Sequence, residues 1–291
     1  MELSDLQVEP TGSVIGAKVS GINLKNEVSQ AVLMELRGLL DQYAVLIFPQ
    51  QYLSPDEFVR AGRIFGSLLP QQLKKYVLKD QPLVGYNSTS DLPRKNGKLH
   101  VRGENYHTDH SNFIEPPRAT ALVAVEIPEI GGDTQFVDTR LAYDNLSSEL
   151  KEISTHLFSK HVHQSSRSPR ELTKLTQEDL AKIPQTIQPL VIRHPNSGRA
   201  ALYLNTGRME GIEGMDDDGA YELIDALYSH AIQQEFEYRH VWSKGEMVIW
   251  DNRSVMHQAN ADYDPEKSRY LYRIMIEGPP IEAFAKNTLK D

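Results

Sequence analysis

The sequence has 291 residues, no cysteine and a formal net charge of −9, from 31 basic and 40 acidic side chains. This acidic balance argues against a dedicated nucleic-acid binder and against a protein that docks on an anionic membrane. Because thiols are absent, disulfides, thiolate metal sites and cysteine nucleophiles are excluded, and any metal must be held by histidine and carboxylate groups.

The first quarter of the chain predicts short strands and two helices. Residues 6–24 contain β-prone pieces interrupted by glycines, and residues 29–43 place leucine and valine at helical spacing. A short apolar run at residues 44–48 is typical of a buried strand. The Ser-Pro-Asp-Glu sequence at residues 54–57 is the start signal of a helix that we expect to run to about Phe65.

The rest of the chain is richer in strands than in helices. Strands are predicted at residues 83–86, 120–125, 134–137, 190–193, 201–204, 246–250 and 270–277. Helices are predicted at residues 142–157 and 219–233. Many strands with few helices between them favour an antiparallel barrel or jelly roll over a regular alternation of strand and helix. We therefore expect a mostly β fold decorated by helices, in a single domain over residues 1–291.

The sequence contains neither the pattern of a secretory signal peptide nor that of a membrane span. The N-terminus lacks a basic start followed by an apolar stretch, and no run approaches the roughly 18 apolar residues that a membrane span needs. We therefore expect a cytoplasmic protein, with no nucleic acid and no membrane among its partners.

The sequence His107-Thr108-Asp109 is the first candidate for chemistry. In a strand, residues i and i+2 point to the same side, so this motif directs an imidazole and a carboxylate toward one point. Two histidines and one carboxylate form the facial triad of non-heme Fe(II) oxygenases, which requires a second histidine from another strand. Taken alone, the motif also suits a histidine in a loop beside a helix N-cap.

Five motifs in order along the chain carry a resemblance to a known family. They are Ile15-Gly16-Ala17 with Val19-Ser20-Gly21, Arg63-Ile64-Phe65-Gly66, Asn105-Tyr106-His107-Thr108-Asp109, Gly131-Gly132-Asp133-Thr134, and Trp250-Asp251-Asn252-Arg253 with His257. With these motifs the chain resembles, nearly end to end, the TauD/TfdA family of taurine- and 2,4-dichlorophenoxyacetate-type dioxygenases. The resemblance implies a double-stranded β-helix core of the jelly-roll, cupin-like type with flanking helices.

The resemblance also implies a cofactor set and the residues that hold it. His107, Asp109 and His257 match the ligands of the catalytic Fe(II), and the family uses 2-oxoglutarate as cosubstrate and O2 as oxidant. Arg269 matches the arginine that holds the distal carboxylate of 2-oxoglutarate, a task that suits a guanidinium fork. Thr134 matches the threonine whose hydroxyl helps to bind that carboxylate.

A second arginine leaves the assignment of the 2-oxoglutarate anchor open. Arg273 matches a family arginine that lies near the anionic group of the substrate or near the iron-proximal carboxylate of 2-oxoglutarate. The stretch from His257 to Arg269 is one residue longer than in the taurine enzyme, so Arg269 and Arg273 both remain candidates for the main anchor.

For the substrate, the resemblance implies a small anionic metabolite with a carboxylate or sulfonate, hydroxylated with release of succinate and CO2. Gly103 stands where the taurine enzyme has a substrate-contacting asparagine, which argues against taurine itself. Residues 71–103 are expected to form a lid or loop over the site. The candidate substrate-binding residues are Tyr76, Tyr86, Asn87, Arg102, His110, Phe113, Asn205, Arg208 and Arg273.

Several alternatives stay open. The same cofactors could support desaturation, cleavage of a C–S or C–O bond, or isonitrile formation on an amino-acid-derived substrate. Two other classes are a zinc-dependent hydrolase or isomerase on the same barrel and a non-catalytic binding or sensor protein. Relatives form dimers or tetramers, so we expect a homo-oligomer.

Some polar residues near the motifs have structural interpretations. Asp251 and Asn252 suit the capping of a turn, and Arg253 suits pairing with a carboxylate. His194 is interpreted as a turn residue. The remaining histidines that could suggest a second metal site are interpreted as solvated: His156, His161 and His163.

Overall fold

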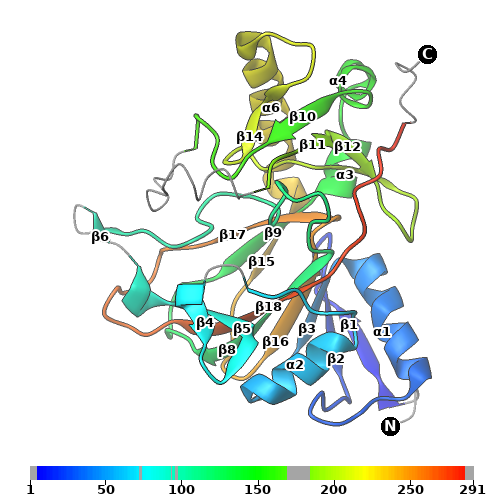
Figure 1. Cartoon of the computed structure of the whole chain (residues 1–291). Helices are drawn as coiled ribbons and strands as arrows, with labels where there is room; N and C mark the ends of the chain where they lie inside the picture. Colours follow the sequence, from blue (N-terminus) through cyan, green and yellow to red (C-terminus); the bar gives the residue numbers. More distant parts are fainter. Residues whose placement is uncertain (1–4, 72–73, 93, 96–97, 169–183, 286–291) are drawn as a thin grey trace.

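The computed structural model describes residues 5–71, 74–92, 94–95, 98–168 and 184–285. At its centre lie a large and a small β-sheet, with helices against the large sheet and a layer of shorter strands and helices at one end (Figure 1). This arrangement confirms the predicted mostly β fold with a jelly-roll core and flanking helices.

The larger sheet joins both ends of the chain and has the strand order β1-β2-β3-β16-β8-β18-β5-β4. Its strands are β1 (Gln7–Pro10), β2 (Ala17–Ser20), β3 (Val45–Phe48), β4 (Val77–Leu78), β5 (Gln81–Ser88), β8 (Ala119–Glu126), β16 (Met247–Asp251) and β18 (Tyr270–Ile276). Neighbouring strands are antiparallel except β2 and β3, which run parallel. The N-terminal strands are therefore part of the same sheet as the last strand, β18.

The smaller sheet has the order β15-β9-β17 and is antiparallel. Its strands are β9 (Thr134–Asp138), β15 (Glu237–His240) and β17 (Val255–Ala259). Apolar side chains of both sheets share one buried cluster, which includes Phe136 of β9, Val255 of β17, Leu122 of β8 and Trp250 of β16. Burial of apolar surface between the sheets is the main force that holds them together.

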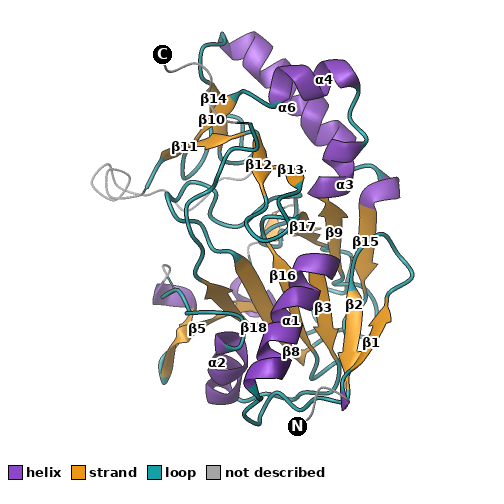
Figure 2. Cartoon of the chain, turned by 90° about the vertical axis from the view of Figure 1, so that its right-hand side faces the viewer, coloured by secondary structure: helices purple, strands orange, loops and turns teal. Residues whose placement is uncertain are grey.

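Two helices cover the outer face of the larger sheet, and Figure 2 shows α1 lying across it. Leu36 of α1 (Gln30–Tyr43) and Phe58 of α2 (Pro55–Arg63) are fully buried against Ile249 of the sheet. Apolar residues at helical spacing thus face the sheet, as the sequence predicts.

Both of these helices begin where the sequence predicts. The Ser29 hydroxyl accepts a hydrogen bond from the backbone N–H of Val32 at the start of α1. Ser54 and Glu57 form a complete capping box, in which each side chain accepts from the backbone N–H of the other residue. These bonds satisfy backbone donors that have no partner inside a helix.

A second layer of short elements lies at one end of the sheets (Figure 1). Its strands are β10 (Phe158–His161), β11 (Thr186–Pro189), β12 (Val191–Arg193), β13 (Ala200–Leu202) and β14 (Met209–Ile212), and its helices are α3 (Thr139–Asp144), α4 (Ser148–Ser154), α6 (Asp217–Ala231) and η4 (Gln234–Phe236). Strands β12 and β13, both at predicted strand positions, pair as an antiparallel hairpin. The remaining elements are η2 (Lys74–Tyr76), η3 (Thr89–Asp91), β6 (Arg94–Lys95) and β7 (Lys98–Leu99).

Within the described residues, no helix is both long and apolar enough to cross a membrane.

The single helix predicted at residues 142–157 is wrong, because two short helices occupy this part of the chain. Helix α3 ends at Asp144, with Asn145 as its C-cap, and Ser147 caps the start of α4 by accepting a hydrogen bond from the backbone N–H of Leu150. A serine that caps a new helix competes with continuation of the preceding one, and apolar spacing alone does not reveal this break.

Candidate metal centre

The predicted metal ligands come together, although not from two regular strands. His257 lies in β17, whereas residues 107–109 lie in a loop that touches β17 through an isolated antiparallel bridge. The backbone N–H of His107 donates to the carbonyl of His257 at 3.0 Å, and the reverse bond is 2.9 Å. The motif therefore lies in a loop, one of the two settings that the sequence left open, and the bridge brings the two histidines to one place.

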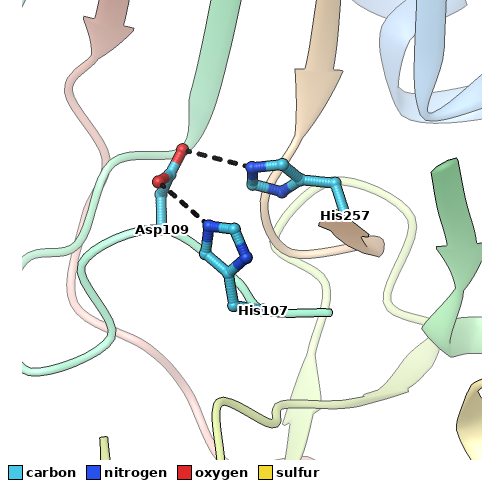
Figure 3. Close-up of side chains that lie close together, drawn as sticks. All are labelled: His107, Asp109 and His257. Atoms are coloured by element: carbon cyan, nitrogen blue, oxygen red, sulfur yellow. Dashed lines mark ion pairs between the residues drawn. The ribbon is translucent and has the colours of Figure 1, made fainter. Parts of the chain in front are cut away.

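The three side chains point toward a common centre (Figure 3). Nε2 of His107 lies 4.0 Å from Oδ1 of Asp109, and Nε2 of His257 lies 4.0 Å from Oδ2. These distances are too long for hydrogen bonds but leave room for an ion that binds imidazole and carboxylate at about 2.0–2.2 Å. Because three such donor atoms lie within 4.8 Å of one another, the residues fit a divalent metal. We call them the metal cluster.

Local contacts hold His107 in a suitable orientation. Its Nδ1 lies 2.8 Å from the carbonyl of Asn105, so Nδ1 carries the hydrogen and Nε2 presents a lone pair. Gly103 has φ +75°, and a Cβ there would lie 2.7 Å from Cε1 of His107. Glycine at this position therefore leaves space for the imidazole.

A buried chain of hydrogen bonds fixes the carboxylate of Asp109. The Thr120 hydroxyl donates to Oδ2 of Asp109 at 2.6 Å, and the amide of Asn252 donates to that hydroxyl oxygen at 3.0 Å. The indole N–H of Trp250 in turn donates to the amide oxygen of Asn252 at 3.0 Å. Since the hydroxyl oxygen of Thr120 accepts from Asn252, its hydrogen is directed at Asp109. Sequence reasoning missed Thr120, and a threonine in an apolar strand gives no signal of this role.

The electrostatic setting favours the protonation states that bind metals. Burial lowers the pKa of His107, and it lowers that of His257 to about 3. Burial by itself raises the pKa of Asp109, but Arg273 and the two histidines outweigh it and hold this pKa well below the usual range. At neutral pH the cluster therefore consists of two neutral imidazoles and one carboxylate, as metal binding requires.

Arg269 is a buried cation beside this centre. Its Nε donates to the carbonyl of Gly132 at 2.8 Å, and it forms no ion pair with any described residue. The neighbouring acids Asp133 and Asp262 pair with Arg239 instead, at 2.7 and 2.5 Å. Burial lowers the pKa of Arg269 to about 10, which leaves it charged at neutral pH. A buried charge without a counterion is costly, so this side chain calls for an anionic ligand.

Thr134 and Arg273 also lie beside the metal cluster, and their side chains have different partners. The Thr134 hydroxyl oxygen accepts from the indole of Trp242 at 3.0 Å, which leaves its hydrogen free to be donated. Arg273 pairs with Oδ1 of Asp109 at 2.9 Å. The two arginines are therefore unequal, since Arg273 has a carboxylate partner and Arg269 has none among the described residues.

A cavity of about 300 Å³ contains the metal cluster, Thr134, Arg269 and Arg273. Five of the other predicted substrate residues line it: Asn87, Arg102, His110, Asn205 and Arg208. Tyr76 and Tyr86 line a smaller adjoining cavity. Phe113 lines neither cavity and packs against His110, with ring centroids 5.0 Å apart. Within the expected lid at residues 71–103, some of the described residues line the two cavities, while residues 72–73, 93 and 96–97 lie outside the description.

Asn205 and Arg208 have structural partners as well. The Asn205 amide donates to the carbonyl of Thr108 at 2.7 Å. Arg208 donates to the side-chain oxygen of Asn112 at 2.8 Å and to the carbonyl of His163 at 2.9 Å. Both residues therefore support the loop that carries the metal ligands and its surroundings.

A second group with metal-ligand chemistry, Asp41, His194 and Asp251, lies elsewhere in the fold, and we call it the tether cluster. His194 donates from Nε2 to Asp251 at 2.7 Å, and both side chains are fully buried. Asp41 already pairs with Arg118 and accepts from Asn196 at 2.6 Å. The interpretation of His194 as an ordinary turn residue is therefore incomplete, because it anchors the β12–β13 hairpin to the end of β16.

Other structural interpretations have mixed outcomes. Asp251 does hold the turn before β17, since it accepts from the backbone N–H of Arg253 and from the Ser254 hydroxyl. Arg253 donates to the carbonyl of Pro279 rather than to a carboxylate. His161 is not solvated, because it is fully buried with Nδ1 2.9 Å from the Ser111 hydroxyl.

Comparison with known proteins gives one consistent result. Residues 7–275 match the family model described as taurine catabolism dioxygenase TauD, TfdA family. The chain is 32% identical over 277 residues to the alpha-ketoglutarate-dependent 2,4-dichlorophenoxyacetate dioxygenase of Cupriavidus pinatubonensis. This match covers 91% of this chain and 95% of that protein. It is 28% identical to the alkylsulfatase of Acinetobacter baylyi, over 94% of this chain and 85% of that protein.

A solved structure is similar over nearly the same extent. It is a putative alpha-ketoglutarate-dependent taurine dioxygenase from Burkholderia xenovorans, which superposes with a TM-score of 0.81 at 27% identity. The match covers 95% of this chain and 91% of that chain. The likeness therefore includes both sheets and the layer at their end.

Proposed function

The chain belongs to the TauD/TfdA family and is an alpha-ketoglutarate-dependent dioxygenase that uses Fe(II), 2-oxoglutarate and O2, and on this basis we propose its ligands, substrate class and outcome. His107, Asp109 and His257 would hold the iron. The observation that supports this most is the convergence of two imidazole Nε2 atoms and one carboxylate beside a buried arginine in a single cavity.

We propose Arg269 as the main anchor of 2-oxoglutarate. Arg269 is buried and lacks an ion-pair partner among the described residues, whereas Arg273 is paired with Asp109. A free guanidinium fork can bind a carboxylate with two charge-assisted hydrogen bonds. Thr134 lines the same cavity and would donate its hydroxyl hydrogen to that carboxylate.

The proposed reaction is hydroxylation of a small organic anion that carries a carboxylate or a sulfo group. When bound, iron and 2-oxoglutarate would supply the activation of O2, whose two oxygen atoms would end in succinate, formed with loss of CO2, and in the hydroxylated product. The protein contributes position and charge: Thr120 holds Asp109, Gly103 leaves space for His107, and Arg273 faces the cavity with its positive charge. Relatives named for a phenoxyacetate and for alkyl sulfates support an anionic substrate.

An anaerobic titration tests the cofactor assignment. Fe(II) with 2-oxoglutarate should give a weak visible charge-transfer band in the wild-type protein. We expect Arg269→Gln to raise the Kd for 2-oxoglutarate at least about tenfold, because a charge-assisted hydrogen bond contributes about 1.5–3 kcal/mol. Arg273→Gln should have the smaller effect, and Arg167→Gln, an exposed arginine paired with Asp225, is the matched control.

Turnover then tests the substrate class. Sulfonates, alkyl sulfates, carboxylates and amino-acid derivatives are supplied with O2, and substrate-triggered succinate is measured together with the hydroxylated product. Absence of the band in the wild-type protein, or turnover that needs no O2, would contradict the proposal. A desaturated or cleaved product without a hydroxylated precursor would replace the proposed outcome.

A further inference from the structure

Three charged residues that have no part in the proposed cofactor site lie directly behind it. They are Asp133, which precedes β9, Asp262, which follows β17, and Arg239 of β15. Nε of Arg239 donates to Oδ2 of Asp133 at 2.7 Å, and Nη2 donates to Oδ2 of Asp262 at 2.5 Å. None of the three lines the main cavity or the smaller one. One guanidinium thus joins carboxylates from two different loops, and we call the three residues the charge clip.

The backbone of Gly132 brings the charge clip next to Arg269. The N–H of Gly132 donates to Oδ1 of Asp262 at 2.8 Å, and its carbonyl accepts from Nε of Arg269 at 2.8 Å. The carboxylate of Asp262 and the guanidinium of Arg269 are therefore bonded to the two polar groups of a single residue. Asp133, the other acid of the clip, is the next residue in the chain.

Both acids of the clip act on the charge of Arg269. Burial lowers the pKa of Arg269 to about 10, whereas Tyr263, Asp133 and Asp262 act to raise it. The two carboxylates are therefore near enough to attract Arg269, although neither forms an ion pair with it. An acid that did pair with Arg269 would occupy the donors that a bound carboxylate needs.

Arg239 gives both acids another partner. Burial acts to raise the pKa of Asp262, but hydrogen bonds from Gly132 and Arg239 outweigh it, so this carboxyl is ionised at neutral pH. The pKa of Arg239 is raised, chiefly by its hydrogen bond with Asp133. Because the side chain of Arg239 is 43% exposed, its ion pairs contribute little to folding stability. The main consequence of the clip is therefore electrostatic, since it compensates two negative charges beside Arg269.

We propose that Arg239 is a positioning residue for the cosubstrate: by pairing with Asp133 and Asp262, it keeps both carboxylates from pairing with Arg269. The guanidinium of Arg269 then stays available for the distal carboxylate of 2-oxoglutarate. This inference rests on the proposed function, because it takes Arg269 as the main anchor. It concerns affinity for the cosubstrate alone, since the clip lies outside the cavity that contains the metal cluster.

The test compares two probes on the anaerobic Fe(II) protein, with the Kd measured by calorimetry. 2-Oxoglutarate carries the distal carboxylate, and 2-oxopentanoate has the same carbon chain without it. The wild-type protein should bind 2-oxoglutarate at least about tenfold more tightly. Arg239→Gln should raise the Kd of 2-oxoglutarate about fivefold, because a fraction of Arg269 is then paired with an acid. The Kd of 2-oxopentanoate should stay within about twofold, whereas a distorted site would weaken both probes.

Neutral replacements of the two acids separate the proposed role from a purely structural one. Asparagine keeps an oxygen that can accept from Gly132, but it offers Arg269 no charge. The triple variant Arg239→Gln/Asp133→Asn/Asp262→Asn should therefore return the Kd of 2-oxoglutarate to within about twofold of wild type. If the clip were only a structural tie, the triple variant would bind at least as weakly as Arg239→Gln.

Two single substitutions complete the set. Arg239→Lys keeps a positive charge near both acids but loses the planar fork, so we expect the Kd of 2-oxoglutarate to rise only about twofold. Arg167→Gln is the matched control, because Arg167 is also an exposed arginine paired with an acid, Asp225, outside both cavities. It should leave the Kd of both probes unchanged, which separates the local effect from loss of a positive charge in general.

The outcomes distinguish this inference from the proposed function. If the wild-type protein showed no preference for 2-oxoglutarate over 2-oxopentanoate, the assignment of the carboxylate anchor would fail, and this inference with it. A normal preference in wild type that persisted unchanged in Arg239→Gln would overturn the charge-clip proposal alone. Equal weakening of both probes in Arg239→Gln, or no recovery in the triple variant, would overturn it as well.

Discussion

The metal cluster and the tether cluster contain the same kinds of side chain, and in each the candidate ligand atoms lie within 4.8 Å of one another. They differ in what surrounds those atoms. In the metal cluster, the imidazole Nε2 atoms stand 4.0 Å from the carboxylate and face a cavity of about 300 Å³. In the tether cluster, His194 donates directly to Asp251 at 2.7 Å, with no cavity beside them among those described.

The carboxylates of the tether cluster are already satisfied by protein groups. The carboxylate of Asp41 pairs with an arginine and accepts a hydrogen bond from an amide. The carboxylate of Asp251 accepts three hydrogen bonds, two of which come from the turn that follows it. The comparison teaches that residue type and spacing do not define a metal site. What defines it is a set of donor atoms that remain available toward an open space.

The largest expected difference between the two clusters is in Fe(II) affinity, and it is tested by removing one histidine from each cluster. We expect His107→Ala to weaken Fe(II) binding more than about 100-fold, because one of three ligands is lost. His194→Ala should leave the Fe(II) affinity within about threefold of wild type. Anaerobic equilibrium dialysis measures both affinities, and His156→Ala, an exposed histidine, is the control. An equal loss of Fe(II) affinity in both variants would show that the two clusters do not differ in metal binding.

The reverse contrast is expected for folding stability. His194→Ala should lower the free energy of unfolding of the metal-free protein by about 3 kcal/mol, because it leaves the buried carboxylate of Asp251 without its main partner. His107→Ala should cost less than about 1 kcal/mol, since the site faces a cavity. Urea unfolding followed by circular dichroism gives both values. A larger loss of unfolding free energy in His107→Ala than in His194→Ala would contradict the stabilising role of His194.

A smaller effect is expected from the hydrogen bond behind the metal cluster. Thr120→Val removes the donor to Asp109 while nearly keeping the shape of the side chain, so we expect Fe(II) affinity to fall about tenfold. Thr120→Ser keeps the hydroxyl and should restore most of the affinity. The position of the charge-transfer band gives a second readout. If the valine variant bound Fe(II) as tightly as wild type, the hydrogen bond would have no part in holding the ligand.

The smallest effect concerns the pH dependence of stability. Burial alone would raise the pKa of Asp251, but hydrogen bonds from His194, the backbone of Arg253 and the hydroxyl of Ser254 hold it below its ordinary range. A carboxyl group with a lower pKa in the folded chain stabilises the fold above its unfolded pKa and loses that contribution as pH falls. Between pH 5 and pH 3 we expect this group to account for about 1 kcal/mol of lost stability.

Asp251→Asn checks this contribution. The variant is destabilised at every pH, but its stability should fall less steeply between pH 5 and pH 3 than that of wild type. Urea midpoints measured across this range provide the slopes. Parallel slopes in the two proteins would show that Asp251 does not carry the dependence.

Much of the candidate metal centre could be predicted from the sequence because its proposed ligands lie in short motifs. His107 and Asp109 are two residues apart, and His257 follows an apolar strand. The fold class was predictable for a similar reason, since strand and helix patterns are local. The helix start at Ser54 is a local signal too, and the cap occurs there as expected.

What escaped prediction depends on contacts between distant parts of the chain. Thr120 and Asn252 are separated by 132 positions, and their hydrogen bond follows from the pairing of β8 with β16. His194 lies beside a proline in the sequence, which indicates a turn but not the buried carboxylate 57 positions away that it meets. The stacking of Arg102 on Tyr76 likewise needs the folded loop, since neither residue belongs to a recognisable motif.

The bridge between His107 and His257 has a consequence for the synthesis of the protein. The two histidines, both proposed metal ligands, are 150 positions apart (257 − 107), and their backbones are hydrogen-bonded to each other in both directions. At about 5–20 residues per second, a ribosome adds His257 roughly 8–30 s after His107. During that interval the nascent chain holds only two of the three proposed ligands, so high-affinity loading of iron is expected only after His257 has been added.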